Sequence, residues 1–108
     1  MGRLIGMPTK IADTYPMIVE WDPEKATRNR RRHRVTFREA VTVLEDPLST
    51  TFPDPDHSVA ERRYLTVGAS ADRRILVVAH TDRRDAVRLI SARRVTPRER
   101  KYYEECKH

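Results

Sequence analysis

The order of hydrophobic and polar residues at the start of the chain predicts a strand followed by a helix. Residues 17–21, MIVEW, are rich in β-forming side chains and predict a first strand. Asp22-Pro23 then supplies a helix N-cap residue and a proline suited to the first helical position, so we expect a helix over roughly Pro23–His33. That helix has almost no apolar side chains and ends in the basic run RNRRRHR. It is therefore either a solvated cover over a sheet or a surface for an acidic partner.

A second helix is predicted from the run that begins at Thr36. Thr36 and Glu39 have the spacing of a capping box, in which each side chain accepts a hydrogen bond from the other residue's backbone N–H. Four apolar residues in this run share one helical face, which predicts a helix packed on the core, and Asp46-Pro47 ends it. These apolar residues are Phe37, Ala40, Val41 and Leu44.

The second half of the chain is predicted to contain four strands and a final helix. The last three of these strands are joined by short polar turns, which are typical of an antiparallel meander. Thr96-Pro97-Arg98-Glu99 combines a capping box with a proline at the first helical position, so a terminal helix follows. The order β-α-α-β-β-β-β-α predicts an α+β domain with its helices packed on one antiparallel sheet. The four predicted strands cover residues 48–52, 62–70, 75–81 and 86–94.

Length and cysteine content set further limits on the architecture. A chain of 108 residues is long enough for one domain with one modest core. Residues 1–16 lack the continuous apolar stretch of a signal peptide, and we expect a flexible arm there before a single domain over residues 17–108. Cys106 is the only cysteine, which excludes a disulfide within one chain and fits a reducing, cytoplasmic location. No apolar run approaches the length of a membrane span, so no membrane role is expected.

Basic residues outnumber acidic ones, and most of the basic residues are arginine. The chain has 22 Lys+Arg against 16 Asp+Glu, a net charge of +6, and 18 of the 22 are arginine. Because guanidinium groups bind phosphate or carboxylate through two parallel hydrogen bonds, this composition favours an anionic partner, and a polyanion more than a small molecule. Arg63, Arg88 and Arg93 lie on predicted strands and are candidate phosphate contacts for RNA. The alternative is a solvated charged face in a chain that uses arginine where others use lysine.

Several common kinds of site are not supported by the sequence. Three unclustered glycines do not make a phosphate-binding loop, and no Ser/His/Asp or Cys/His set has a recognisable spacing. One cysteine and scattered histidines are too few for a zinc site. Asp54, Asp56 and His57 could suggest a site for a hard metal ion, but a proline-rich turn stabilised by its own aspartates is the expected structure. We therefore predict neither a metal nor a cofactor.

Two histidines could transfer a proton near neutral pH, because an unperturbed imidazole titrates near pH ~6.5. His33 ends the basic helix, with Asn29 one turn before it and Lys25 one turn before that on the same face. His80 closes the apolar strand over residues 75–81. The alternative for each is a structural histidine, since proton transfer needs a positioned partner that the sequence does not identify.

Longer motifs of the chain resemble the BrnT family of bacterial type II toxins. The matching run begins with EWDPEKATRNRRRHRVTFREAVTVLEDPL at residues 20–48 and continues through FPDPDH, ERRYLTVG, ILVVAHT and RLISARRVTPRERKYYEE. One departure is Arg34, which stands where the family usually has glycine after the histidine. A glycine there would end the helix in a left-handed turn at little cost, so Arg34 leaves the position of the helix end open.

The resemblance implies a RelE-like fold and metal-independent cleavage of RNA that arrests translation. It also implies a partner, a BrnA-type antitoxin with a ribbon-helix-helix DNA-binding region that neutralises the toxin. DNA is then expected to bind only through the antitoxin complex, which represses its own operon. Such complexes are hetero-oligomers that commonly contain more than one copy of each chain.

The chemistry of the candidate residues suggests how such a cleavage could proceed. Without a metal, RNA cleavage requires activation of a ribose 2′-hydroxyl, stabilisation of charge at the phosphate and protonation of the leaving oxygen. Our hypothesis gives charge stabilisation to Arg63 and Arg93 and the acid or base role to His33. The alternative is a non-catalytic basic module that binds nucleic acid without chemistry. The expected substrate-binding residues are Lys25, Arg88 and His80, and His80 also substitutes for His33 if that residue is structural.

Overall fold

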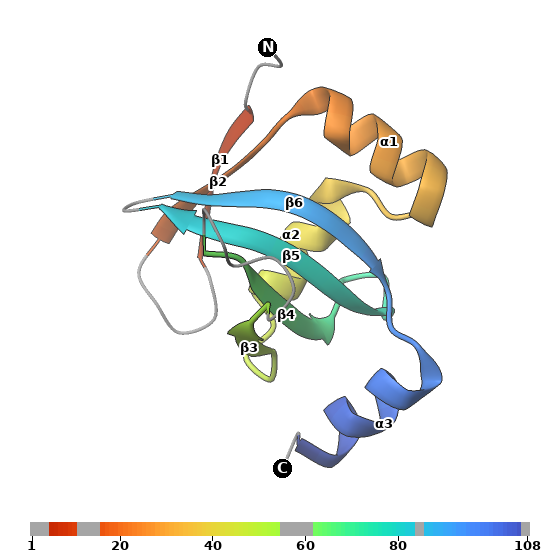
Figure 1. Cartoon of the computed structure of the whole chain (residues 1–108). Coiled ribbons are helices and arrows are strands. Elements are labelled where there is room, and N and C mark those ends of the chain that lie inside the picture. The colour runs from red at the N-terminus through yellow and green to blue at the C-terminus, as the bar shows by residue number, and fades with distance from the viewer. Residues whose placement is uncertain (1–4, 11–15, 55–61, 84–85, 107–108) are drawn as a thin grey trace.

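The chain forms one mixed sheet with helices on both of its faces (Figure 1). The computed structural model describes residues 5–10, 16–54, 62–83 and 86–106, and these contain six strands and three helices. The strands are β1 (Ile5–Lys10), β2 (Pro16–Trp21), β3 (Thr50–Pro53), β4 (Tyr64–Ala69), β5 (Ile75–Arg83) and β6 (Ala86–Arg94), and the helices are α1 (Pro23–His33), α2 (Phe37–Leu44) and α3 (Pro97–Cys106).

Strands β2 and β6 are parallel neighbours, whereas the other neighbouring strands pair antiparallel. The strand order is β1-β2-β6-β5-β4-β3, and β2 pairs with β6 only from Ile18–Ala86 to Glu20–Arg88. The predicted antiparallel sheet is therefore wrong for this pair. Short turns reveal the direction of consecutive strands only, and β2 and β6 are separated by two helices and three strands.

Residues 5–10 form strand β1, which lies at one edge of the sheet and pairs antiparallel with β2. The sequence predicts a flexible arm over residues 1–16 and no strand there. The segment IGMPTK has no alternation of polar and apolar residues, and it contains Pro8, which strands tolerate mainly at a sheet edge. Residues 1–4 and 11–15 lie outside the described part of the chain.

Helices α1 and α2 cover one face of the sheet, and α3 lies against the other (Figure 1). The larger core joins Phe37 of α2 to Leu76 of β5 and Leu89 of β6, each at most 2% exposed. A smaller cluster joins Tyr103 of α3 to Val77, which follows Leu76 in β5 and so points to the opposite face. The predicted α+β architecture is confirmed. None of the helices in the described residues is long and apolar enough to cross a membrane.

A β-bulge interrupts β6 at Ile90. His80 of β5 pairs with Leu89, whereas the residue before His80 pairs with Ser91, so Ile90 has no partner on β5. The extra residue shifts the alternation, and Leu89 and Ala92 both contribute to the larger core. The strict alternation expected over residues 86–94 is therefore wrong beyond Ile90.

Arg93 and Arg94 nevertheless face opposite sides of the sheet, as predicted. Arg93 pairs in register with Val77, which belongs to the cluster beneath α3. Arg94 pairs with Leu76, which faces α2. The end of β6 therefore presents one guanidinium group toward α3 and one toward α2.

The predicted helix starts are found, but one of the two capping boxes is only half formed. Asp22 Oδ1 accepts a hydrogen bond from Glu24 N at 2.9 Å at the start of α1. Thr36 Oγ1 accepts one from Glu39 N at 3.1 Å at the start of α2. The Glu39 carboxylate does not return to Thr36, because it forms a stronger charge-assisted contact with Arg74.

Helix α1 covers Pro23–His33, as predicted, and ends at Arg34. This residue has φ 61° and ψ 31°, the left-handed conformation that favours glycine, and its N–H donates to Arg30 O at 3.0 Å. The chain therefore ends α1 with a glycine-type turn that is made by an arginine.

Candidate functional site

One face of helix α1 and the bulged part of β6 line a basic hollow of about 280 Å³. The α1 residues on its wall are three, four or one positions apart, so they share one helical face. We call this feature the α1–β6 hollow. Its lining residues are Lys25, Arg28, Asn29, Arg32 and His33 from α1 and Ile90 and Ser91 from β6.

The α1–β6 hollow brings together two of the six predicted site residues, Lys25 and His33. It also contains Arg28 and Arg32, which the sequence analysis did not single out. Their helical spacing from Lys25 and His33 could have identified them. Ser91 enters the wall through the bulge of β6, which no pattern in the sequence indicated.

The environment of His33 favours the neutral imidazole. Burial lowers the pKa of His33 below its usual 6.5, and the positive charges of Arg32 and Arg93 lower it further. A histidine with a lowered pKa is unprotonated at neutral pH and can accept a proton. The contribution of Arg93 also means that its charge lies close enough to act on His33, although Arg93 is not part of the wall.

Arg93 is held by Glu99 at the start of α3. Arg93 Nη1 donates to Glu99 Oε1 at 2.8 Å, and Nη2 donates to Oε2 at 2.9 Å. Glu99 also accepts from Thr96 N at 2.8 Å, and Thr96 Oγ1 accepts from Glu99 N at 3.1 Å, which confirms the second predicted capping box. Hydrogen bonding from Arg93 is the main cause that lowers the pKa of Glu99 to about 2. The guanidinium and carboxylate therefore stay charged together.

Arg63 and Arg88 do not line the α1–β6 hollow. Arg63 precedes β4, which is separated from β6 by β5, and it lines a different hollow of about 270 Å³. Arg88 lies in the first half of β6 and pairs in register with Glu20, before β2 leaves the sheet. The predicted cationic residues are thus spread over the sheet and do not converge on one point.

His80 is buried and uses both ring nitrogens. Its residue exposure is 4%, its Nε2 lies 2.7 Å from Thr66 Oγ1, and its Nδ1 lies 2.7 Å from Asp82 Oδ1. Thr66 Oγ1 lies 2.7 Å from Thr51 Oγ1 in turn, and the ring stacks on Tyr64 with centroids 6.0 Å apart. His80 therefore belongs to a row of hydrogen-bonded side chains across β5, β4 and β3, and it does not line the α1–β6 hollow.

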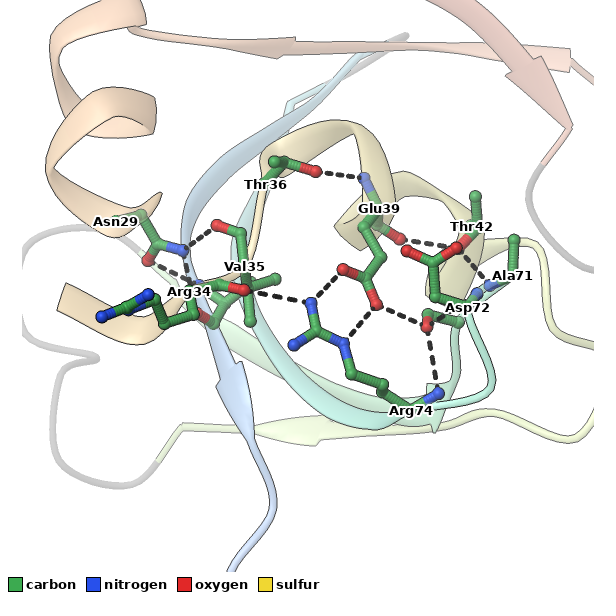
Figure 2. A network of polar contacts seen from close by, with 11 residues as sticks. Asn29, Arg34, Val35, Thr36, Glu39, Thr42, Ala71, Asp72 and Arg74 are labelled. Carbon is green, nitrogen blue, oxygen red and sulfur yellow. Dashed lines mark hydrogen bonds and ion pairs between the residues drawn. The ribbon is translucent and has the colours of Figure 1, made fainter. Parts of the chain in front are cut away.

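The turn that follows His33 is held by a polar network (Figure 2). Arg74 forms an ion pair with Glu39, in which Arg74 Nε donates to Glu39 Oε2 at 2.8 Å, and Ser70 Oγ donates to the same oxygen at 2.7 Å. Arg74 Nη2 also donates to Arg34 O at 3.1 Å. Hydrogen bonding from Arg74 is the main cause that lowers the pKa of Glu39, whose side chain is only 7% exposed. The buried carboxylate is therefore compensated, and Arg74 ties the end of α1 to α2.

Within the described ranges, no group of three or more His, Cys, Asp or Glu side chains is placed to hold a metal ion. Asp56 and His57 of the loop considered above lie outside those ranges. Asp54 is described, and its backbone N–H donates to Arg63 O at 2.9 Å.

Comparisons with known proteins agree with the motifs and the fold. A family model described as "Ribonuclease toxin, BrnT, of type II toxin-antitoxin system" matches residues 21–99. The crystal structure of the Brucella abortus ribonuclease toxin, BrnT, is similar with a TM-score of 0.56 and 23% identity, covering 70% of this chain and 92% of that one. No curated protein matches. The structural likeness supports the fold, and the family match spans both α1 and β6, so the chain belongs to the BrnT family of ribonuclease toxins of type II toxin–antitoxin systems.

Proposed function

We propose that the chain is an endoribonuclease that cleaves RNA without a metal ion and thereby arrests translation. One observation carries the proposal: the α1–β6 hollow places a histidine with a lowered pKa among the cations Lys25, Arg28 and Arg32. The cations suit the phosphates of a nucleic acid, and the histidine suits proton transfer at neutral pH.

In the proposed reaction, His33 acts first as the base. The neutral imidazole takes the proton of a ribose 2′-hydroxyl, whose oxygen forms a bond to the adjacent phosphorus while the bond from phosphorus to the 5′-oxygen breaks. The cations of the hollow stabilise the negative charge that builds up on the phosphate oxygens. The leaving 5′-oxygen receives its proton from a second donor, for which Lys25 is our candidate because it lies on the same wall. The products are a 2′,3′-cyclic phosphate and a 5′-hydroxyl.

Arg93 contributes its charge at the edge of this site. Its effect on His33 supports a role near the reacting phosphate, while its two-pronged contact with Glu99 means that the phosphate competes with a carboxylate for the same guanidinium. We assign Arg63 and Arg88 to RNA further from the bond that is cut, since neither lines the α1–β6 hollow. His80 is the weaker candidate for acid–base chemistry because both ring nitrogens are engaged.

The partner in this proposal is a BrnA-like antitoxin with a ribbon-helix-helix region. The description of the family as a type II toxin supports a protein antitoxin in general. In our proposal the two proteins form a hetero-oligomer in the cytoplasm, the complex binds operator DNA through the antitoxin, and RNA is the substrate of the released toxin.

The test is cleavage of single-stranded RNA by the purified protein in the presence of EDTA. Wild type should cut the RNA, and His33→Gln should bind RNA but leave it intact. Arg31→Ala is the control, because it removes a charge from α1 without changing the wall of the hollow. Wild-type protein that binds RNA with strong salt dependence and never cuts it would instead be a non-catalytic nucleic-acid-binding module.

A further inference from the structure

In the described part of the chain, no strand pairs with the outer side of the second half of β6. β2 pairs with β6 only as far as Arg88 and then continues into α1, whereas β6 continues to Arg94. Backbone N–H and C=O groups that are buried without a partner each cost free energy comparable to a lost hydrogen bond. The backbone of the fully buried Ala92 therefore needs partners from outside the sheet.

The side chain of Asn29 supplies these partners. Asn29 Oδ1 accepts from Ala92 N at 3.0 Å, and Asn29 Nδ2 donates to Ala92 O at 2.9 Å. Its amide thus replaces the missing strand at this one position of β6. Nδ2 also donates to Val35 O at 2.9 Å, so the same amide joins α1, β6 and the segment before α2.

Asn29 lies at the centre of the basic face of α1. Lys25 is four residues before it and His33 four residues after it, so the three side chains follow one another along one side of the helix. A helix anchored at its middle residue cannot rotate or slide on β6 without breaking the bonds to Ala92. The Asn29 amide therefore determines where Lys25 and His33 stand relative to Ser91 on the opposite wall.

A second set of bonds holds the end of the same helix. Val35 O is bound by Asn29, and Arg34 O is bound by Arg74, so two successive carbonyls of the turn after His33 are tied to different parts of the fold (Figure 2). His33 thus stands between an anchor on β6 and an anchor on the β4–β5 side of the sheet. Because α1 has almost no apolar face to bury, these polar anchors are what hold it in place on the sheet.

We propose that Asn29 is a positioning residue of the RNA-cleaving site, holding His33 and Lys25 against β6 without contacting RNA itself. The inference rests on the function proposed above for the α1–β6 hollow. Asn29 is 6% exposed, and its amide is occupied by three backbone groups, so it has little left to offer a substrate. Its contribution is to geometry, and displacement of a catalytic group by about 1 Å can lower a rate by roughly 100-fold.

The test compares Asn29→Ala and Asn29→Asp with a core variant of similar stability. Asn29→Ala removes all three hydrogen bonds, and Asn29→Asp retains an acceptor for Ala92 N but loses the donors to two carbonyls. Val43→Ala is the matched control, because Val43 is fully buried in α2 and does not line the α1–β6 hollow. All proteins are compared at a temperature at which circular dichroism shows them folded.

We expect both Asn29 variants to lower kcat for RNA cleavage by roughly 10- to 100-fold with a smaller change in KM, because the cations of the wall remain. Val43→Ala should keep the wild-type kcat. In Asn29→Ala the pKa of His33, followed by NMR, should move back up toward 6.5, since His33 is no longer held against β6. Asn29 variants that behave like Val43→Ala in kcat and in the His33 titration would overturn the inference.

The NMR measurement separates this inference from the proposed function. If the wild-type protein does not cleave RNA, the proposed reaction is refuted. The His33 titration in Asn29→Ala still reports whether Asn29 holds the helix in place. A wild-type protein that cleaves RNA, together with an unchanged His33 pKa and kcat in the variants, refutes the positioning role alone.

Discussion

The guanidinium of Arg93 faces the carboxylate of Glu99 through two parallel hydrogen bonds of 2.8 and 2.9 Å, and this ion pair joins the end of β6 to the first turn of α3. Both side chains are more than a third exposed, so solvent weakens the pair relative to a buried one. The two-pronged geometry nevertheless lowers the pKa of Glu99 to about 2. The ion pair has two consequences. It orients α3, and it occupies the guanidinium of Arg93, which we propose contacts the RNA phosphate.

Glu99→Gln should lower stability in a way that depends on pH. A carboxylate whose pKa falls from 4.5 to about 2 on folding stabilises the protein above pH 4.5, and this contribution is lost as the pH falls toward 2. Glutamine retains one oxygen for the capping box but loses the charge and the second acceptor for Arg93. The Tm difference between wild type and variant should be largest above pH 4.5 and shrink below it.

Glu104→Gln provides the control for this measurement. Glu104 lies on the same helix in an exposed pair with Arg100 at 3.9 Å, and such pairs contribute little. A Tm difference for Glu99→Gln that is equally large at pH 2 and pH 7 would contradict the assigned role of the ion pair.

Arg74→Ala should destabilise the fold by roughly 2–3 kcal/mol, because it leaves the buried Glu39 carboxylate without its charged partner. It also removes the donor to Arg34 O and so loosens the turn after α1. Urea unfolding of Arg74→Ala, Glu39→Ala and the double variant measures the coupling. The double variant should be clearly more stable than the sum of the single losses implies, whereas simple additivity would mean that the two side chains act independently.

Arg34→Gly should stabilise the protein by about 0.5–1 kcal/mol. Arg34 has φ 61°, and the left-handed conformation costs an ordinary residue more than it costs glycine. The bonds through its backbone N–H and carbonyl remain available to glycine. Urea unfolding checks the gain, with Arg32→Gly two residues earlier as the control, because glycine inside a helix destabilises by about 1 kcal/mol. A loss of stability in both variants would contradict the prediction.

The sequence predicts the starts of the helices more firmly than the end of α1 at Arg34. The starts of α1, α2 and α3 were predicted from their capping residues, because capping uses side chains at fixed short spacings. These residues are Asp22, Thr36 and Thr96. The end of α1 stays open in the sequence because an arginine stands where glycine would favour a left-handed turn, yet Arg34 adopts that turn with φ 61°. Short-range capping chemistry therefore predicts where the helices begin, whereas a left-handed turn made by an arginine has no such local signature.

The site was harder to predict than the fold, because it is formed by elements that are far apart in the sequence. Lys25 and His33 share a helical face that can be read from their spacing, but the wall opposite them depends on the bulge at Ile90. The anchoring role of Asn29 depends on where β2 leaves β6, a parallel pairing that no short turn reveals. A sequence pattern can place residues on one element, whereas the meeting of two elements requires the topology.

Arg28→Ala and Arg32→Ala should each weaken RNA binding and reduce its dependence on salt. Both side chains line the α1–β6 hollow, and each phosphate contact to a single strand contributes about 0.7 to the slope of log K against log salt. Titrations of a labelled RNA at several salt concentrations give these slopes. Arg31→Ala removes the same charge from the same helix without lining the hollow, so it should change the slope less. Equal losses for all three variants would point to general attraction by a basic helix.

The pH dependence of cleavage should report His33. Burial and the charges of Arg32 and Arg93 lower its pKa, so the acid limb of kcat/KM, which reflects the free protein, should have its midpoint below pH 6.5. Arg32→Gln removes one of these charges and should move that midpoint to higher pH, in step with the His33 pKa measured by NMR. In the wild type, the acid limb of kcat should have its midpoint at a higher pH than that of kcat/KM, because a bound phosphate stabilises the protonated imidazole. A profile that is unchanged in His33→Gln would show that another group accepts the proton.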